Sequence, residues 1–218
     1  MSAQHYDIVI IGAGLSGIGT ACHIARQFPN KSMAIIERRE KVGGTWDLFR
    51  YPGIRSDSDM ASFGFDFKPW YSEKVLAKGG DIREYVAETA REFGLYDKVQ
   101  YGLKLDNADW SSNEQQWTLY TQHEASGESR EFTCGFMVNC AGYYNYDQGY
   151  RPHFAGEENF KGQIIHPQQW PEELDYSGKK VVVIGSGATA ITLVPAMAEK
   201  AAKVTMLQRC PSSIMAQT

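Results

Sequence analysis

The stretch YDIVIIGAGLSGIGTACHIARQFPNKSMAIIE, residues 6–37, predicts a strand, a glycine-rich turn, a helix and a second strand, in that order. Residues 6–11 are a short apolar run bounded by glycine, which is typical of a strand buried on both faces of a parallel sheet. The next stretch carries apolar residues at helical spacing until Pro29, and residues 32–37 form a second apolar run that ends on Glu37. This order predicts a nucleotide-binding βαβ unit.

The turn in this stretch has the spacing G-x-G-x-x-G, with glycines at positions Gly12, Gly14 and Gly17. Gly12 would allow the tight turn, Gly14 would let a pyrophosphate approach the helix N-terminus, and Gly17 would let helix and strand pack closely. Glu37 lies twenty residues past Gly17 and can accept hydrogen bonds from both ribose hydroxyls of an adenosine. We therefore predict a dinucleotide site that prefers an unphosphorylated ribose, as in FAD.

The same order of elements recurs later in the sequence. KKVVVIG predicts a buried strand that runs into Gly185-x-Gly187, and an alanine takes the third glycine position, which this fingerprint tolerates. A helix follows to about Lys200, and Pro195 within it predicts a kink. The sequence therefore predicts a second nucleotide-binding unit.

The two predicted units differ where their second strand ends. KVTMLQR ends on Gln208 and Arg209, whereas the corresponding strand of the first unit ends on an acid. An acid would repel a 2′-phosphate and an arginine can bind it, which favours NADPH at the second site. The alternative is that Arg209 is a solvated surface charge. A chain that combines an FAD site with an NADPH site is typical of a flavoprotein that takes hydride from NADPH.

An irregular segment follows the strand that ends on Glu37. Gly43 and Gly44 could offer backbone amides to the diphosphate of a flavin cofactor. Trp46 could lie against the edge of the isoalloxazine ring or in the core. Asp57 could hold a cationic side chain near the flavin, or it could lie with Asp59 on a solvated loop.

The middle of the sequence predicts one helix and a β-meander. Residues 81–93 form an amphipathic helical pattern. Short alternating runs then predict three strands, at roughly 99–110, 116–122 and 130–134. The last run leads into FMVNCAG, a further apolar strand that we expect to rejoin the parallel sheet beside the first nucleotide site.

Composition excludes several classes of function. The 218 residues are 43% apolar, so a sizeable core can form, and the net charge of -4 leaves no basic excess for nucleic acid or an anionic membrane. The N-terminus has no basic region typical of a signal peptide, and the apolar run Ile8–Ile11 is too short to cross a membrane.

Cysteine usage points to the cytoplasm. Cys22, Cys134, Cys140 and Cys210 form no C-x-x-C pair, and no histidine cluster joins them at zinc spacing. We therefore predict no metal site and reduced, mostly buried thiols. The lack of C-x-x-C also argues against a pyridine-nucleotide disulfide reductase, which would use two similar nucleotide sites.

Five motifs, taken in order, resemble those of the flavin-dependent class B monooxygenases: GAGLSG, EKVGGTWDLFRYPGIRSDSD, CAGYYN, FKGQIIHPQQWP and GSGATA. The fourth motif, residues 160–171, fits the Baeyer–Villiger signature F-x-G-x-x-x-H-x-x-x-W-P. The segments GGTWDLFRYPGIRSDSDM and CAGYYNYDQGY are similar in sequence to those of the ethionamide-activating monooxygenases and their bacterial relatives. The resemblance implies an α/β flavoprotein with two Rossmann-like dinucleotide-binding domains, a parallel sheet and a β-meander crossover.

The resemblance also implies roles for matching residues. Asp57 would position an active-site arginine beside the cofactor, and His166 would coordinate domain movement without lying against the flavin ring. The FAD-binding residues would be Gly12, Gly14, Gly17, Glu37, Gly44, Thr45, Trp46 and Asp57. The NADPH-binding residues would be Gly185, Gly187, Thr189 and Arg209.

Family members are substantially longer, so the resemblance implies a truncated second Rossmann-like domain. It divides the chain into the N-terminal part of an FAD-binding domain at 1–150, a linker at 151–178 and the start of an NADP-binding domain at 179–218. The arginine that Asp57 would orient lies, in the family, beyond Thr218. We expect an N-terminal fragment of an NADPH- and O₂-dependent FAD monooxygenase that oxygenates ketones or thioethers. The alternative is a shortened, non-catalytic FAD-binding protein.

Overall fold

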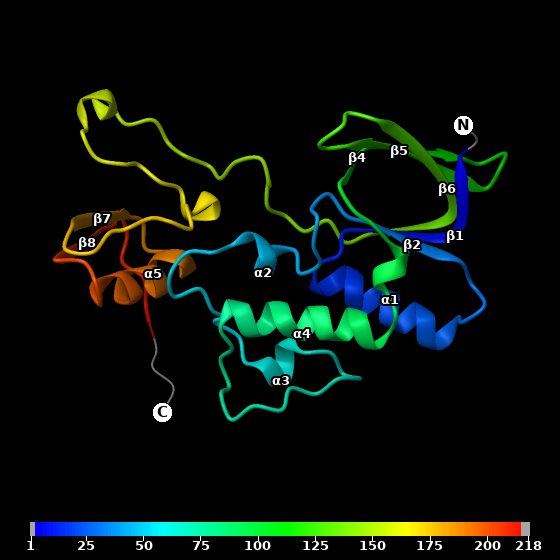
Figure 1. The fold of residues 1–218 in the computed structure, drawn as a ribbon, viewed down its shortest axis with the longest axis horizontal. Helices are drawn as coiled ribbons and strands as arrows, with labels where there is room; N and C mark the ends of the chain where they lie inside the picture. Colours follow the sequence, from blue (N-terminus) through cyan, green and yellow to red (C-terminus); the bar gives the residue numbers. More distant parts are fainter. Residues whose placement is uncertain (1–2, 215–218) are drawn as a thin grey trace. The chain divides into compact units, whose positions relative to one another are not determined.

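The chain forms two compact units in a computed structural model that describes residues 3–214 (Figure 1). The first unit comprises the described residues up to Asp47 together with 65–68 and 80–144. The second unit comprises 48–64, 69–79 and the described residues from Asn145 onwards. The functional division predicted for 1–150, 151–178 and 179–218 stays a prediction, and positions 215–218 of the last range lie outside the described residues.

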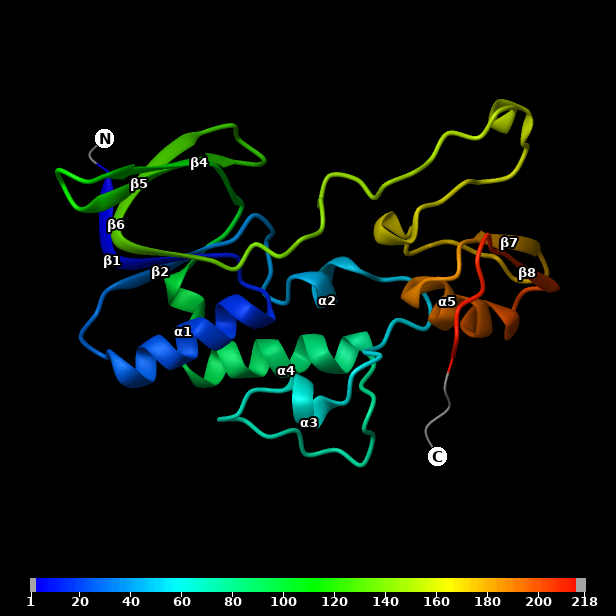
Figure 2. The same ribbon diagram turned by 180° about the vertical axis from the view of Figure 1, so that it is seen from behind.

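The first unit is built on a six-stranded sheet with the strand order β3-β2-β1-β6-β5-β4 (Figures 1 and 2). The β1–β2, β2–β3 and β1–β6 pairs are parallel, and the β4–β5 and β5–β6 pairs are antiparallel. The predicted parallel sheet with a meander crossover is therefore confirmed. The strands are β1 Gln4–Ile11, β2 Met33–Ile36, β3 Val99–Gln100, β4 Leu103–Ser111, β5 Gln116–His123 and β6 Ser129–Asn139.

The division of the middle of the sequence into strands was predicted wrongly in two places, although the number of strands is the same. The run at 99–110 is two strands, because Gly102 takes a positive φ of 69° and redirects the chain between β3 and β4. The run at 130–134 and FMVNCAG are one strand, β6. It pairs with β5 along its first half and with β1 from Phe132 to Asn139, so it does join the parallel sheet as expected.

The core of the first unit is apolar and centred on the parallel strands. Val9, Ile10, Ile35 and Ile36 are fully buried, in agreement with strands that are covered on both faces. Helix α1, Leu15–Gln27, follows β1 and buries a face that includes Ile18, Ala21 and Cys22. Helix α4, Gly79–Glu92, begins two residues before the predicted 81–93 and ends one residue earlier. It buries Ile82, Tyr85, Val86 and Ala90 at helical spacing.

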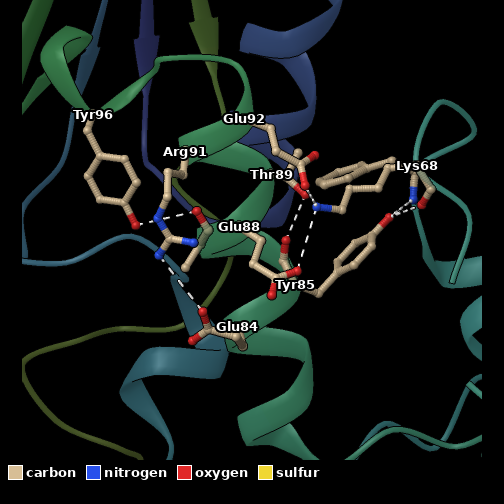
Figure 3. A network of polar contacts seen from close by, with 10 residues as sticks. Lys68, Glu84, Tyr85, Glu88, Thr89, Arg91, Glu92 and Tyr96 are labelled. Atoms are coloured by element: carbon tan, nitrogen blue, oxygen red, sulfur yellow. Dashed lines mark hydrogen bonds and ion pairs between the residues drawn. The ribbon is translucent and has the colours of Figure 1, made fainter. Parts of the chain in front are cut away.

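Residues 65–68 belong to the first unit because they are anchored on α4 (Figure 3). The Tyr85 hydroxyl accepts a hydrogen bond from the Phe65 amide at 2.8 Å and donates to the Lys68 carbonyl at 2.6 Å. Lys68 Nζ lies 2.7 Å from a carboxylate oxygen of Glu92 and 3.7 Å from one of Glu88. The Phe65 ring also stacks on Tyr85 with 5.3 Å between the centroids.

The second unit contains the predicted second βαβ unit, but its first strand was wrongly predicted as buried: its residues alternate between exposed and half-buried. Strands β7, Lys180–Ile184, and β8, Lys203–Leu207, are parallel and joined through α5, Ala188–Ala198, which contains Pro195. The predicted kink at Pro195 stays a prediction. Tyr51, Leu193 and Met197 form the buried centre of this unit. The remaining short helices of the chain are α2 Thr45–Leu48, α3 Met60–Phe63, η1 Tyr96–Lys98, η2 Glu157–Asn159 and η3 Pro167–Gln169.

The cysteines differ in their exposure. Cys22 and Cys134 are buried, which raises the pKa of Cys22 to about 12 and also raises the pKa of Cys134. Cys140 is half-buried and Cys210 is exposed, so the predicted burial holds for two of the four thiols. Between residues 3 and 214, the helices are too short or too polar to cross a membrane.

Candidate dinucleotide-binding sites

The first glycine-rich turn joins β1 to α1 and leaves no room for a side chain at Gly12 or Gly17. Gly12 has a φ of 101°, and a Cβ built on it would lie 2.6 Å from the carbonyl oxygen of Cys140. A Cβ on Gly17 would lie 1.8 Å from the Gly12 carbonyl oxygen. Gly14 is the N-cap of α1, and no side chain caps this helix end. The uncapped N-terminus therefore offers backbone amides in the manner that suits a pyrophosphate.

Glu37 lies against this turn. Its side chain is only 4% exposed, and its carboxylate accepts hydrogen bonds from the Ala13 amide at 2.7 Å and the Arg39 amide at 2.8 Å. Burial raises the pKa of Glu37, and the two amide bonds oppose that rise. The acid that the sequence predicts as a ribose acceptor is therefore held in one orientation beside the turn.

The double glycine forms a loop next to the same turn. Gly43 and Gly44 both take positive φ angles, of 122° and 55°, and the Gly43 amide donates to the Ala13 carbonyl at 3.0 Å. A Cβ on Gly14 would lie 3.4 Å from the Gly44 Cα, so the two predicted phosphate-binding elements are in contact. Thr45 and Trp46 are half-buried at the start of α2, which leaves both interpretations of Trp46 open.

The sequence-based prediction missed an ion pair that closes this loop. Arg39 Nη2 donates to Asp47 Oδ2 at 2.6 Å and to the Asp47 carbonyl at 3.2 Å. The Asp47 side chain is 3% exposed. In the sequence this ion pair appears only as an arginine and an aspartate on either side of a double glycine. That arrangement does not by itself indicate that the two side chains are in contact.

The second glycine-rich turn is more open than the first. Gly185 has a φ of 124° and its amide donates to the Leu207 carbonyl at 2.8 Å, which ties the turn to the end of β8. A Cβ on Gly185 or Gly187 would meet no atom of residues 3–214 within 4 Å. Gly187 is the N-cap of α5, again without a side-chain cap, and Thr189 lies half-buried in the first turn of the helix. This helix end also suits an anionic ligand.

Arg209 is exposed and lies in a segment that is held beside the second turn. Ser186 Oγ donates to the Cys210 carbonyl at 3.2 Å, and Ser212 Oγ donates to the Ser186 carbonyl at 2.7 Å. These contacts fix the chain immediately after Arg209. Neither serine was assigned a role from the sequence, although Ser186 lies within the glycine turn and Ser212 lies three residues past Arg209.

Asp57 and Asp59 lie in the second unit and have different surroundings. Asp57 is about half exposed, and its Oδ1 lies 4.0 Å from Nε of Arg55, whose side chain is equally exposed. Asp59 is the N-cap of α3, because its Oδ1 accepts a hydrogen bond from the Ser62 amide at 2.8 Å. That bond lowers the pKa of Asp59. Asp59 is thus a helix cap, and the role predicted for Asp57 stays a prediction.

His166 lies in a compact turn of the second unit. It is the N-cap of η3, and its Nδ1 accepts a hydrogen bond from the Gln168 amide at 3.2 Å. The Gln168 side chain is buried and donates through Nε2 to the Asn145 carbonyl. A Cβ on Gly149 would lie 2.0 Å from the imidazole, so residues 145–149 pack directly on this turn. Neither Gly149 nor Gln168 was assigned a role from the sequence.

The end of the signature loop is fixed by packing. Trp170 meets Tyr176 edge-to-face with 6.3 Å between the ring centroids, and both join the cluster of Tyr51, Leu193 and Met197. The loop is therefore held at His166 and at Trp170 within the second unit. Within the part of the chain that the structure describes, no group of three His, Cys, Asp or Glu side chains is placed to hold a metal ion.

Comparison with curated proteins places the chain among flavin-dependent enzymes. MymA of Mycobacterium tuberculosis (strain H37Rv), which is named as an FAD-containing monooxygenase, is 63% identical over 215 residues. The FAD-containing monooxygenase EthA of the same strain is 55% identical over 215 residues. These alignments cover 97% and 98% of this chain but 43% and 44% of the relatives, so the chain spans less than half of their length.

Solved structures give the same result. An oxidized steroid monooxygenase bound to NADP matches with a TM-score of 0.81 and 30% identity, over 94% of this chain and 39% of that one. Cyclohexanone monooxygenase from Rhodococcus sp. Phi1, bound to NADP⁺, matches with a TM-score of 0.80 and 28% identity, over 96% and 39%. A family model described as flavin-binding monooxygenase-like matches residues 5–218. The chain therefore belongs to the flavin-binding monooxygenase-like family, as its motifs predict.

Proposed function

We propose that this chain supplies the FAD- and NADPH-binding parts of an NADPH- and O₂-dependent monooxygenase of the Baeyer–Villiger type. The observation that carries the proposal is the contrast between the two turns. A buried acid, Glu37, lies beside the first turn, and an exposed cation, Arg209, follows the strand beside the second. The acid suits a plain ribose and the cation suits a 2′-phosphate, so the first turn would bind FAD and the second NADPH.

Each site has residues that fit its cofactor. The uncapped N-terminus of α1 would bind the FAD pyrophosphate, and the loop at Gly44, Thr45 and Trp46 would follow the cofactor from there. The uncapped N-terminus of α5 would bind the NADPH pyrophosphate. Bound FAD would supply the chemistry of O₂ activation, and the chain would orient both cofactors and limit their contact with water.

Asp57 and His166 have proposed roles outside the two turns. Asp57 would hold a cationic side chain near the flavin. Its partly exposed carboxylate lies 4.0 Å from Nε of Arg55, which supports pairing with a guanidinium. His166 would transmit movement of the signature loop, which is supported by its packing on Gly149 and its hydrogen bond with Gln168.

The substrate class that we propose is a ketone or a thioether. The signature at 160–171 and the structural relatives named for cyclohexanone and for a steroid support a ketone. The similarity to EthA, a monooxygenase, supports oxygenation as the reaction, but the name of EthA gives no substrate. The expected location is the cytoplasm, on the basis of the four free cysteines.

The proposal is tested by cofactor titration of the 218-residue chain. FAD binding, measured by the change in flavin fluorescence, should be strong, and Glu37→Ala should weaken it by about 1–3 kcal/mol, roughly 5- to 150-fold in Kd, because charge-assisted hydrogen bonds are lost. Uptake of NAD with no uptake of flavin would contradict the proposal.

A second assay separates the enzyme from the non-catalytic alternative. NADPH consumption, hydrogen peroxide release and ester or sulfoxide product are measured together, with a simple ketone and a thioether, on this chain and on a relative of full length. We expect the full-length protein to form product in step with NADPH use. Flavin binding without any NADPH oxidation in either protein would favour a non-catalytic FAD-binding protein.

A further inference from the structure

The segment from Glu37 to Asp47 is closed at both ends by charged side chains. At one end, Glu37 accepts the amides of Ala13 and Arg39. At the other end, the Arg39 guanidinium binds the carboxylate and the carbonyl of Asp47. Arg39 therefore takes part in both closures, through its amide at the first and its side chain at the second. We name this segment, residues 37–47, the Arg39 bracket.

The bracket encloses the double glycine of the first site. Gly43 and Gly44 both require positive φ angles, and a glycine-rich segment has many alternative conformations when it is not held. A Cβ on Gly43 would lie 3.0 Å from the Asp47 Cβ, so Asp47 packs directly on this loop. The shape of the loop therefore depends on where Asp47 is held, and Arg39 holds it.

The charges of the pair favour a role in binding. Asp47 carries a carboxylate that is 3% exposed, immediately after a loop that suits the diphosphate of a cofactor. An uncompensated buried carboxylate would both destabilise the loop and repel that diphosphate. The Arg39 guanidinium, 2.6 Å away, compensates this charge. Its Nη2 carries two N–H groups, so the same nitrogen also binds the Asp47 carbonyl at 3.2 Å.

We propose that the Arg39–Asp47 pair is a positioning device for FAD, which links the ribose-binding acid Glu37 to the diphosphate-binding loop at Gly43 and Gly44. The inference rests on the proposed FAD site and deepens it. Neither residue has to touch the cofactor. Loss of Arg39 is predicted to be worse than loss of the whole pair, because it removes the guanidinium that binds the buried Asp47 carboxylate.

The test is a double-mutant cycle read out by FAD binding. Arg39→Ala should weaken FAD binding at least tenfold. Asp47→Asn should weaken it less, and Arg39→Ala combined with Asp47→Asn should recover part of the affinity lost in Arg39→Ala alone. Arg39→Lys keeps the charge and loses the planar guanidinium, so its FAD affinity should lie between those of wild type and Arg39→Ala. It is the milder variant to use if Arg39→Ala does not fold.

The adjacent arginine provides a matched control. Arg38 Nη2 pairs with Glu124 at 3.1 Å, in the turn between β5 and β6, and is outside the Arg39–Asp47 closure. Arg38→Ala should leave FAD affinity within about twofold of wild type, because the Arg38–Glu124 pair is partly exposed and such pairs contribute little. If removing any arginine near the site weakened binding, Arg38→Ala and Arg39→Ala would both bind FAD with lower affinity than wild type.

Limited proteolysis gives a readout that does not depend on the cofactor. Lys41 is exposed within the bracket and is a site for trypsin. Without FAD, cleavage after Lys41 should be several-fold faster in Arg39→Ala than in wild type or Arg38→Ala, because the released loop samples open conformations. FAD should slow this cleavage in wild type.

The possible outcomes separate this inference from the proposed function. Wild-type FAD affinity in Arg39→Ala, or losses in the double variant equal to the sum of the single losses, would overturn the inference alone. Equal cleavage after Lys41 in Arg39→Ala and Arg38→Ala would also overturn it. No FAD binding by any variant or by wild type would overturn the proposed function, and this inference with it.

Discussion

Replacement of Gly149 by alanine should destabilise the second unit through His166. A Cβ at position 149 would lie 2.0 Å from the imidazole Cε1 and 2.2 Å from Nδ1, whereas ordinary contact begins at 3.4 Å. The ring must therefore move by at least about 1 Å, and it loses the hydrogen bond from the Gln168 amide. Overpacking costs about 1–3 kcal/mol and the lost hydrogen bond about 1 kcal/mol.

His166 is half-buried, so its ring can move towards water, which reduces the combined cost of overpacking and of the lost hydrogen bond. We expect Gly149→Ala to lower the free energy of unfolding by about 2 kcal/mol, measured by urea titration. Gly80→Ala is the matched control, since its Cβ would meet nothing within 4 Å and Gly80 lies in α4. That variant should be unchanged or more stable by about 0.5–1 kcal/mol.

A second background tests the mechanism of this effect. In a His166→Ala protein the space beside Gly149 is vacant, so Gly149→Ala should cost less than about 0.5 kcal/mol there. An equal loss in both backgrounds would show that Gly149→Ala acts without His166 and would refute the reasoning. No loss in wild type would refute it as well.

Three further predictions concern the two nucleotide sites. Burial raises the pKa of Glu37, so the stability of wild type relative to Glu37→Gln should fall as pH rises above about 4.5. Urea titrations without FAD measure this, and a stability difference that does not change with pH would contradict it. Arg209→Ala should weaken NADPH binding about tenfold and leave NADH binding unchanged; equal losses in the two titrations would make Arg209 structural. Ser212→Ala should weaken NADPH binding by about 0.5–1.5 kcal/mol, because it releases the segment after Arg209 from Ser186, and unchanged affinity would contradict that role.

The βαβ units could be predicted from the sequence because their signals are local. Each consists of a short apolar run, a glycine turn and a helical pattern within about forty residues. The structure places β1, α1 and β2, and later β7, α5 and β8, within a few residues of the predicted positions. Glu37 lies beside its turn for the same reason, since the end of β2 is adjacent to the end of β1 in the sheet.

The errors arose where pairing between distant segments decides the structure. β6 pairs with β5 on one side and β1 on the other, and its pattern changes along its length because its surroundings change, so it was predicted as two strands. Gly102 interrupts an alternating run with a single residue.

The missed site residues have the same explanation. Arg39 meets Asp47 and Gly149 meets His166 across loops, and no period in the sequence reports contacts between irregular segments.

The closure of the first turn by β6 has a consequence for synthesis on the ribosome. The Cys140 amide donates to the Ile11 carbonyl at 2.8 Å, and the Cys140 carbonyl lies against Gly12. The residue that follows β6 therefore packs on the first glycine-rich turn. Contacts this far apart in sequence form late in folding. A nascent chain that has not yet released Cys140 has β1 without its β6 neighbour, so capture of the flavin must wait for the meander to emerge. A translational pause before β6 would prolong the exposure of an apolar strand edge, and chaperones would be needed most at that stage.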